Sequence, residues 1–235
     1  MSFIDTFLWA VFPYLTSTIF IIGHIIRYNV DQFGWSAQSS EFLEKRQLKW
    51  GSLLFHWGIV FVFFGHVAGI MIPKIIYDTV GVSDHLYHMG ALWLGGAAGV
   101  ATVIGGFLLF LRRSGHRRIR NNSSFNAMFT LVLLGAVVLV GFTATVGYAA
   151  SGGDFDYRTT ISPWFRGLLL FNPQPELMVG APFGFQLHVI LAFALFAVWP
   201  FTRLVHVWSL PLEYLTRNYI IFRKMNAQQI ARRVK

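Results

Sequence analysis

Four histidines lie in otherwise apolar parts of this 235-residue chain, in two long hydrophobic stretches that are far apart in the sequence. The first stretch contains His56 and His66, and the second contains His188 and His206. An imidazole in the apolar interior of a membrane is energetically costly, so each of these residues is a candidate for a functional site. On one helix, His56 and His66 would be separated by about 15 Å along the axis, too far to share one metal ion. The spacing predicts two separate sites.

The chemistry available to these sites is restricted by the absence of cysteine from the sequence. Disulfides, thiolate-bound zinc, iron–sulfur clusters and a covalently attached c-type haem are all excluded. A mononuclear metal requires three or more converging ligands, whereas two histidines are available at each level. A haem needs only one axial imidazole on each face, and its macrocycle fills the space between two helices with apolar surface. The pattern favours haem, with hydrogen-bonded histidines in a proton-relaying, haem-free transporter as the alternative.

The composition indicates that a membrane surrounds these sites. Hydrophobic residues make up 55% of the chain and charged residues only 12%, against about 25% charged in soluble domains. A membrane-spanning helix needs about 20 predominantly apolar residues, and five stretches meet this requirement. The predicted spans are residues 2–26, 50–72, 87–111, 125–150 and 183–208. We therefore predict an all-α fold, a polytopic membrane helical bundle with five transmembrane helices.

The basic residues predict the orientation of the bundle. The formal net charge is +9, and sixteen of the nineteen Lys and Arg residues lie in the segments 27–49, 112–120 and 203–235. Clustering at the ends of apolar stretches is typical of membrane sorting, so we do not expect a nucleic-acid partner. The positive-inside rule then predicts an outer N-terminus and a cytoplasmic C-terminus, in a multi-pass protein of the cell (cytoplasmic) membrane.

This topology predicts which histidines meet. The second span runs outward and the fifth runs inward, so His56 should lie with His206 near the cytoplasm, and His66 with His188 toward the outside. The two histidines of the fifth span are about 27 Å apart on a continuous helix, compared with about 15 Å on the second. We expect helix tilt and a kink at Pro200 to accommodate this difference.

Several long stretches also resemble one known family. The chain resembles the gamma subunit of respiratory nitrate reductase, a membrane cytochrome b. The similarity is densest in IIGHIIRYNVDQFGWSAQSS, LFHWGIVFVFFGHVAGIMIP, GGAAG and LHVILAFALFAVWPFTRLVHVWSLPLEYLTRNY. A cytochrome b that anchors a formate dehydrogenase or a hydrogenase is the alternative within the same chemistry.

The resemblance implies two non-covalently bound b haems, an inner one held by His56 and His206 and an outer one held by His66 and His188. It also implies that quinol is oxidised near the outer haem, that protons are released outside, and that electrons pass through the inner haem to a cytoplasmic iron–sulfur beta subunit. Nitrate reduction would belong to the molybdenum-containing catalytic alpha subunit, so we expect no catalytic residue for nitrate in this chain.

Two further sets of residues are candidates for contacts with these ligands. The outer connection between the second and third spans contains Lys74, His85 and His88, which we predict to bind quinol and accept its protons. The ordinary pKa of imidazole suits proton transfer near neutral pH, although a solvated loop is the alternative. On the inner side, Arg112 and Arg203 lie at the depth expected for the haem propionates, and positive-inside sorting explains the same arginines without haem.

The remaining segments complete the predicted organisation. We expect a transmembrane cytochrome b domain over residues 1–210 and a cytoplasmic amphipathic basic tail over 211–235. Such a tail suits either the membrane surface or a partner protein, and the resemblance favours docking of the iron–sulfur subunit. Within the segment 151–182, the short apolar piece WFRGLLLF is expected to lie along the membrane interface.

Overall fold

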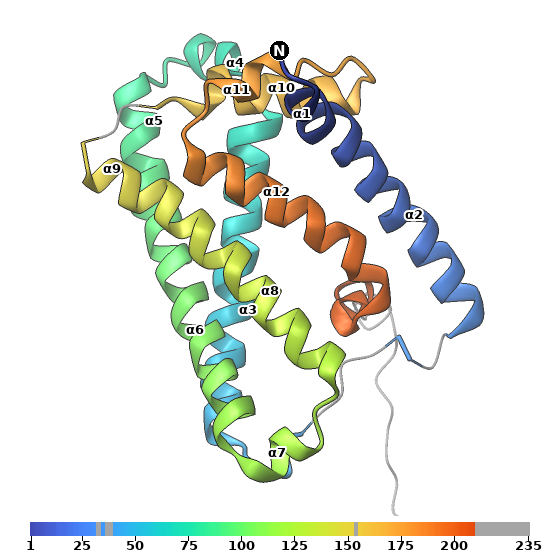
Figure 1. Cartoon of the computed structure of the whole chain (residues 1–235). Coiled ribbons are helices and arrows are strands. Elements are labelled where there is room, and N and C mark those ends of the chain that lie inside the picture. The colour runs from blue at the N-terminus through green and yellow to red at the C-terminus, as the bar shows by residue number, and fades with distance from the viewer. Residues whose placement is uncertain (32–33, 36–39, 153–154, 210–235) are drawn as a thin grey trace, which may run out of the picture.

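The chain forms a bundle of long helices (Figure 1). The computed structural model describes residues 1–31, 34–35, 40–152 and 155–209. Within these ranges every regular secondary-structure element is a helix. Five helical segments are long and apolar enough to cross a membrane. These spans are Phe3–Val30, Arg46–Met71, Asp84–Gly115, Phe125–Gly147 and Phe183–Phe201. The predicted all-α fold with five spans is confirmed.

Each of the first four spans contains one five-residue π-helical turn. The first span comprises α1 (Phe3–Thr6), the π turn η1 (Phe7–Val11) and α2 (Phe12–Val30). The second comprises α3 (Arg46–His66) and the π turn η2 (Val67–Met71). The third comprises α5 (Asp84–Gly90), the π turn η3 (Ala91–Gly95) and α6 (Gly96–Gly115). The fourth comprises α8 (Phe125–Phe142), the π turn η4 (Thr143–Gly147) and α9 (Tyr148–Ala150).

All four π turns lie toward one end of the bundle, the end that carries the N-terminus, and we call this end the N-terminal face (Figure 1). Short helices also gather at this face: α4 (Lys74–Thr79), α10 (Ile161–Leu169) and α11 (Glu176–Val179), with the 3-10 turn η5 (Tyr157–Thr159) leading into α10. The opposite end carries α7 (Arg117–Asn121), and we call it the α7 face. The π turns and the short helices therefore share one end of the bundle.

The closest packing in the bundle joins α3 to α6, which run side by side along most of their length. Two glycines permit this approach. A Cβ atom at Gly105 would lie 2.3 Å from the Phe55 nitrogen, and one at Gly58 would lie 2.5 Å from the Thr102 hydroxyl oxygen. Small residues of this kind allow membrane helices to pack closely. This pairing gives α3, which carries His56 and His66, a rigid support.

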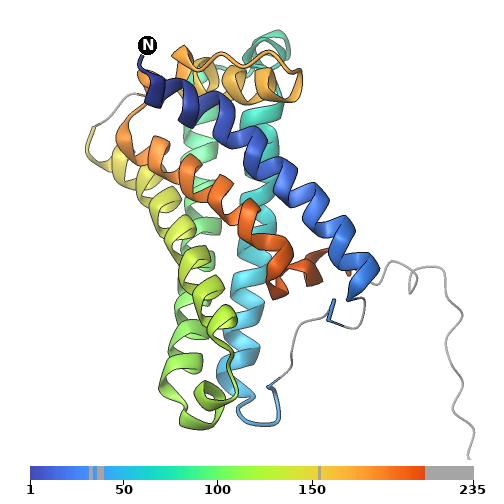
Figure 2. The same cartoon turned by 45° about the vertical axis from the view of Figure 1, so that its right-hand side comes forward.

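The N-terminal face is covered by α10. The side chain of Trp164 is fully buried there, and its indole nitrogen donates a hydrogen bond to the Trp9 carbonyl at 2.8 Å. Tyr14 donates a hydrogen bond to the Leu168 carbonyl at 3.0 Å, which ties α10 to the first span a second time. Figure 2 shows α10 lying across the end of the bundle instead of along it. The piece predicted to lie along the membrane interface therefore includes a helix that packs into the core.

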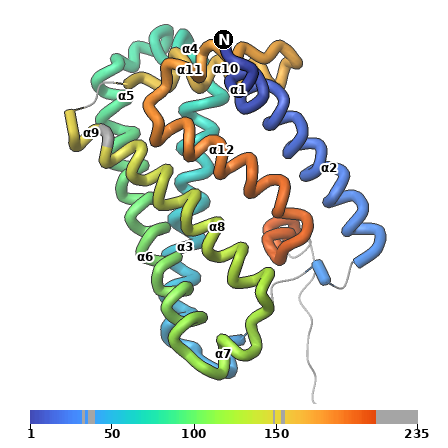
Figure 3. The backbone as a smooth tube through the Cα atoms, viewed as in Figure 1, coloured from blue at the N-terminus to red at the C-terminus, as the bar shows by residue number. Residues whose placement is uncertain are grey.

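The fifth span differs from the continuous, kinked helix expected to reach residue 208. Its helix α12 (Phe183–Val198) ends just before Pro200, and two 3-10 turns follow, η6 (Trp199–Phe201) and η7 (Arg203–Trp208). Proline lacks the amide hydrogen that would continue the helix, and its ring clashes with the preceding turn. Between the two turns, Thr202 has an extended backbone, so the chain changes direction after α12, as Figure 3 shows. The tail predicted over 211–235 lies outside the described residues.

The basic residues are distributed unequally between the two faces. Three of the basic residues, Lys74, Arg158 and Arg166, belong to elements at the N-terminal face, whereas α7 and the adjoining end of α6 carry an arginine cluster. The positive-inside rule places the arginine-rich end in the cytoplasm. An outer N-terminal face remains a prediction from this rule.

Candidate haem-binding site

The four candidate histidines form two pairs. The ring centroids of His66 and His188 are 6.0 Å apart, and those of His56 and His206 are 6.4 Å apart. A metal ion bound to one nitrogen of each ring at about 2.0 Å would place the two centroids about 6 Å apart. The pairing expected from topology is therefore the pairing in space, with the His66–His188 pair nearer the N-terminal face.

Each of the four imidazoles directs Nδ1 at a backbone carbonyl. The partners are Ser52 O for His56 at 2.8 Å, Val62 O for His66 at 2.7 Å, Val137 O for His188 at 3.0 Å and Arg203 O for His206 at 2.6 Å. A carbonyl can only accept, so Nδ1 must carry the proton in these bonds. The neutral ring then presents the Nε2 lone pair, the arrangement usual for a histidine that binds a metal.

His24 is a useful contrast because both of its ring nitrogens have protein partners. Its Nδ1 lies 2.6 Å from the Phe20 carbonyl, and its Nε2 accepts a hydrogen bond from the Trp208 indole at 3.2 Å. No nitrogen lone pair is left to bind a metal. His24 therefore has a structural role at the end of the first span.

The donor set fits haem. Among the described residues, no group of three or more His, Cys, Asp or Glu side chains could hold a metal ion by itself. Two axial nitrogens suffice only where the remaining ligands come from a macrocycle. The side chains of His56 and His66 are exposed, and a Cβ atom at Gly65 would meet no atom within 4 Å. Open space therefore borders α3 next to His66.

Helix α8 determines the position of His188. The Val137 carbonyl on this helix accepts the Nδ1 hydrogen bond, and Gly141 lies one turn further on. A Cβ atom at Gly141 would lie 2.5 Å from Cε1 and 2.7 Å from Nδ1 of the imidazole. Only glycine leaves room for the ring here, so α8 supplies both a hydrogen-bond acceptor and a recess for His188.

His206 reaches its partner because the chain bends after α12. The guanidinium of Arg27 donates hydrogen bonds to the Pro200 and Thr202 carbonyls, both at 2.7 Å. The Asn126 amide donates to the Phe201 carbonyl at 2.6 Å. These side chains come from α2 and α8, so two neighbouring spans hold the bend that directs His206 toward His56. Neither Arg27 nor Asn126 was among the residues selected from the sequence.

The two arginines predicted to contact haem propionates differ in their surroundings. Arg112 is 3% exposed, and its guanidinium donates to Glu44 and Ser40 at distances of 2.8 to 2.9 Å. These contacts occupy all three of its nitrogens and fasten the segment before α3 to α6. Arg203 lines a cavity of about 200 Å³ together with Arg27, and its carbonyl holds His206. The geometry therefore favours Arg203 over Arg112 as a candidate near the inner pair.

The predicted quinol residues lie on α4 and α5 at the N-terminal face. Lys74 forms an ion pair with Asp84, which also accepts a hydrogen bond from Arg158 at 2.9 Å. His85 is exposed and His88 is partly buried. The ionic contacts link α4, α5 and the turn before α10 across this face.

His88 lies close enough to Asp156 to interact with its charge. Burial alone would raise the pKa of the Asp156 carboxyl, but hydrogen bonds from Arg158 hold this pKa below its ordinary value. Asp156 therefore carries a negative charge near neutral pH. Of the two predicted proton acceptors, His88 is the one that lies near this carboxylate.

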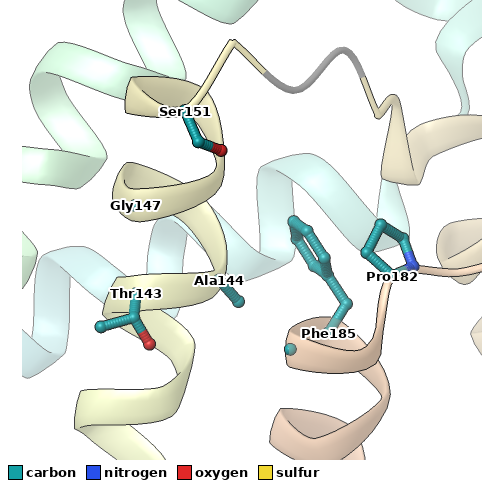
Figure 4. Close-up of a pocket in the computed structure, with 7 residues that line it drawn as sticks. Thr143, Ala144, Gly147, Ser151, Pro182 and Phe185 are labelled. Atoms are coloured by element: carbon teal, nitrogen blue, oxygen red, sulfur yellow. The ribbon is translucent and has the colours of Figure 1, made fainter.

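A cavity of about 250 Å³ opens between η4 and the start of α12 (Figure 4). Its lining residues are Thr143, Ala144, Gly147, Ser151, Pro182, Gly184 and Phe185. Gly184 lies one turn before His188 on α12, so the cavity borders the helix that carries His188. Lys74, His85 and His88 are not among its lining residues.

The fold and the site define a class: a five-span helical membrane protein with two histidine pairs between its spans. The chain belongs to the nitrate reductase gamma subunit family, because the profile of that family matches residues 5–225. The resemblance found in the sequence is confirmed.

Individual relatives agree with this assignment. The chain is 51% identical over 217 residues to the nitrate reductase gamma chain of Bacillus subtilis (strain 168), covering 92% of this chain and 97% of the relative. It is 35% identical over 224 residues to the respiratory nitrate reductase 2 gamma chain of Escherichia coli (strain K12), covering 95% and 98%. It is also 41% identical over 216 residues to the nitrate reductase-like protein NarX of Mycobacterium tuberculosis (strain ATCC 25618 / H37Rv), covering 92% of this chain and 33% of that longer protein.

Proposed function

We propose that this chain is the membrane-anchoring, di-haem cytochrome b subunit of a respiratory nitrate reductase in the cytoplasmic membrane. It oxidises quinol at the outer, N-terminal face, releases protons there, and delivers electrons to a cytoplasmic iron–sulfur subunit. The observation that carries the proposal is the pairing of four histidines whose Nδ1 atoms all donate to carbonyls. Family membership supports nitrate reductase over a formate dehydrogenase or hydrogenase as the complex that contains the chain.

In this proposal His56 and His206 hold the inner b haem, and His66 and His188 hold the outer one. When bound, each haem accepts and donates one electron. The carbonyl partners hold the proton on Nδ1 of each imidazole, leave Nε2 as the nitrogen that would bind iron, and would increase its basicity as a ligand. The carbonyls that accept these Nδ1 hydrogen bonds lie on α3, α8 and η7. Each histidine is therefore oriented before the haem binds.

The direction of transfer conserves energy. An electron that moves from the outer face to the cytoplasm against an inside-negative potential stores about 2.3 kcal/mol per 100 mV if it crosses the whole membrane. Quinol oxidation also requires a proton acceptor within hydrogen-bond reach of the ring oxygen. We assign this role to His88, which lies near the Asp156 carboxylate, and we retain Lys74 and His85 as quinol-binding candidates.

The reduction of nitrate would take place on other subunits. The chain contains no cysteine, so it cannot ligate an iron–sulfur cluster through thiolates. We propose that it works with an iron–sulfur beta subunit and a molybdenum-containing catalytic alpha subunit, and that lipid-dissolved quinol is its substrate.

Visible spectroscopy of the purified complex tests this function. We expect a strong Soret band and an alpha band that appears on addition of a quinol and disappears on addition of nitrate. A complex without a Soret band would favour a haem-free transporter in which the histidines relay protons. Haem bands that respond to formate or hydrogen, and not to nitrate, would assign the chain to a different complex.

A further inference from the structure

The π turn η2 begins immediately after His66, and three consecutive carbonyls of this turn accept hydrogen bonds from side chains of other elements. The donors are the Tyr77 hydroxyl to Ala68 O at 2.9 Å, the Ser162 hydroxyl to Gly69 O at 2.9 Å and the Arg166 guanidinium to Ile70 O at 2.7 Å. Backbone carbonyls in an apolar environment need such partners. The turn that follows a candidate haem ligand is therefore held in place from outside its own helix.

Two of the three donors come from α10. Ser162 is completely buried, so its hydrogen bond to η2 has no competition from solvent. Further along α10, Trp164 donates to the carbonyl of Trp9 in η1, the π turn of the first span. One short helix thus donates hydrogen bonds to two separate π turns. Ser162 and Arg166, one turn apart on α10, therefore fix its position relative to the second span.

Gly69 provides a second contact between this region and η2. A Cβ atom at Gly69 would lie 2.7 Å from the Tyr157 hydroxyl, so glycine allows that hydroxyl to approach the backbone. The same hydroxyl lies 2.9 Å from the hydroxyl of Tyr87, and the Arg158 guanidinium lies over the Tyr87 ring at 4.1 Å. The turn preceding α10 therefore also contacts η2.

We propose that α10 is a positioning element for the outer histidine site, with Ser162 and Arg166 as its positioning residues. His66 donates its Nδ1 proton to Val62 O within α3, so its ring orientation follows the orientation of the helix end. Because η2 continues that helix end, its attachment to α10 determines how His66 faces His188. This assignment rests on the proposed function, since it concerns an axial ligand of the outer haem.

The orientation and environment of axial imidazoles affect both the spectrum and the reduction potential of a haem. Removal of the Ser162 hydroxyl should therefore alter the outer haem and leave the inner haem unchanged. Arg166 supplies a positive charge as well as a hydrogen bond. A nearby cation favours the reduced, less positive form of the haem.

The experiment compares the variants S162A, R166Q and R166K with S114A, in the intact complex. Ser114 is a matched control, because its hydroxyl bonds the Phe110 carbonyl within α6, near the α7 face. Low-spin ferric EPR signals and redox titrations are recorded for both haems, and the outer signal is identified as the one that H66A removes.

We expect S162A and R166Q to shift or broaden the outer EPR signal, and R166K and S114A to retain it. At a fixed potential, R166Q should also lower the reduced-to-oxidised ratio of the outer haem about threefold or more. Unchanged outer signals in both S162A and R166Q would overturn the assignment. Equal changes in both haems would also overturn it, because they would indicate a general loss of structure. A wild-type complex without haem would instead overturn the proposed function, and this assignment with it.

Discussion

At the scale of single residues, the Nδ1 hydrogen bond of each paired histidine determines which nitrogen can bind a metal. Three of these histidines bond a carbonyl three or four residues earlier in their own segment, whereas His188 bonds Val137 on a different helix. The outer site consequently depends on a contact between α8 and α12. The inner site depends more on the path of the chain after α12.

The first prediction concerns the pairing itself. Single substitutions of the four histidines by alanine should give two classes of spectrum. H66A and H188A should remove one haem component, and H56A and H206A should remove the other, because each haem loses one axial ligand in either of its two variants. H24A serves as the control and should retain both components, since the nitrogens of His24 are occupied by protein partners. Four different spectra, or a grouping by helix, would be inconsistent with the pairing.

The second prediction uses two glycines of α8. The substitution G141A would place a Cβ atom 2.5 Å from the His188 ring, whereas a Cβ atom at Gly135 would meet nothing within 4 Å. G141A should therefore displace His188 and diminish the outer haem component by a large fraction, and G135A should leave both components intact. Absorbance at the alpha band of each purified variant measures the outcome. Equal haem content in the two variants would show that α8 does not position His188.

At the scale of elements, the bend after α12 places His206 opposite His56. On a continuous helix, His206 would lie about 27 Å beyond His188, whereas the two histidines of α3 are only about 15 Å apart. The change of direction at Thr202 instead brings the His206 ring to a centroid distance of 6.4 Å from His56. Arg27 stabilises the bend through its two hydrogen bonds to carbonyls of the bend.

The third prediction is that R27Q destabilises the inner site selectively. Hydrogen bonds from a charged donor contribute about 1.5–3 kcal/mol each, and their loss would leave the Pro200 and Thr202 carbonyls without this partner. The inner haem component should be lost at a lower temperature than the outer one, as followed by absorbance during heating. K45Q is the matched control, because the pair between Lys45 and Glu41 is on the surface and such pairs contribute little. If R27Q and K45Q lost both haems at the wild-type temperature, Arg27 would not support the bend.

The sequence contained enough information to predict the spans and the histidine pairs. Apolar stretches of sufficient length and the distribution of basic residues gave the topology, and antiparallel spans then allowed only one pairing by depth. The bend was predicted only as a kink at Pro200, because its direction depends on Arg27, a tertiary contact from the first span. The role of Gly141 was also not apparent, since a glycine in an apolar stretch looks the same whether or not it faces a ligand. The π turns were not predicted from the sequence.

At the scale of the whole molecule, the two faces have different compositions. Ion pairs, tyrosines and short helices cover the N-terminal face, whereas arginines dominate the α7 face. This asymmetry suits quinol oxidation on one side and docking of a soluble partner on the other. The C-terminal segment predicted to dock that partner lies outside the described residues.

The fourth prediction concerns this tail. Truncation after Leu210 should leave both haems bound but prevent electron delivery to the iron–sulfur subunit, because the inner site lies toward the arginine-rich face. The measurement is quinol-driven haem reduction followed by reoxidation with nitrate in the truncated complex. Normal reoxidation with the partner still attached would show that the tail is only a membrane anchor, and loss of haem would show that it is part of the fold.

The central claim is that one chain holds two haems at two separate histidine pairs. Pyridine-haemochrome analysis of the purified complex, combined with quantitation of this chain, tests it most directly because the result is a ratio that does not depend on activity. The account predicts two b-type haems per chain, with H66A and H56A each reduced to one. A fully loaded wild-type preparation with one haem per chain would contradict it.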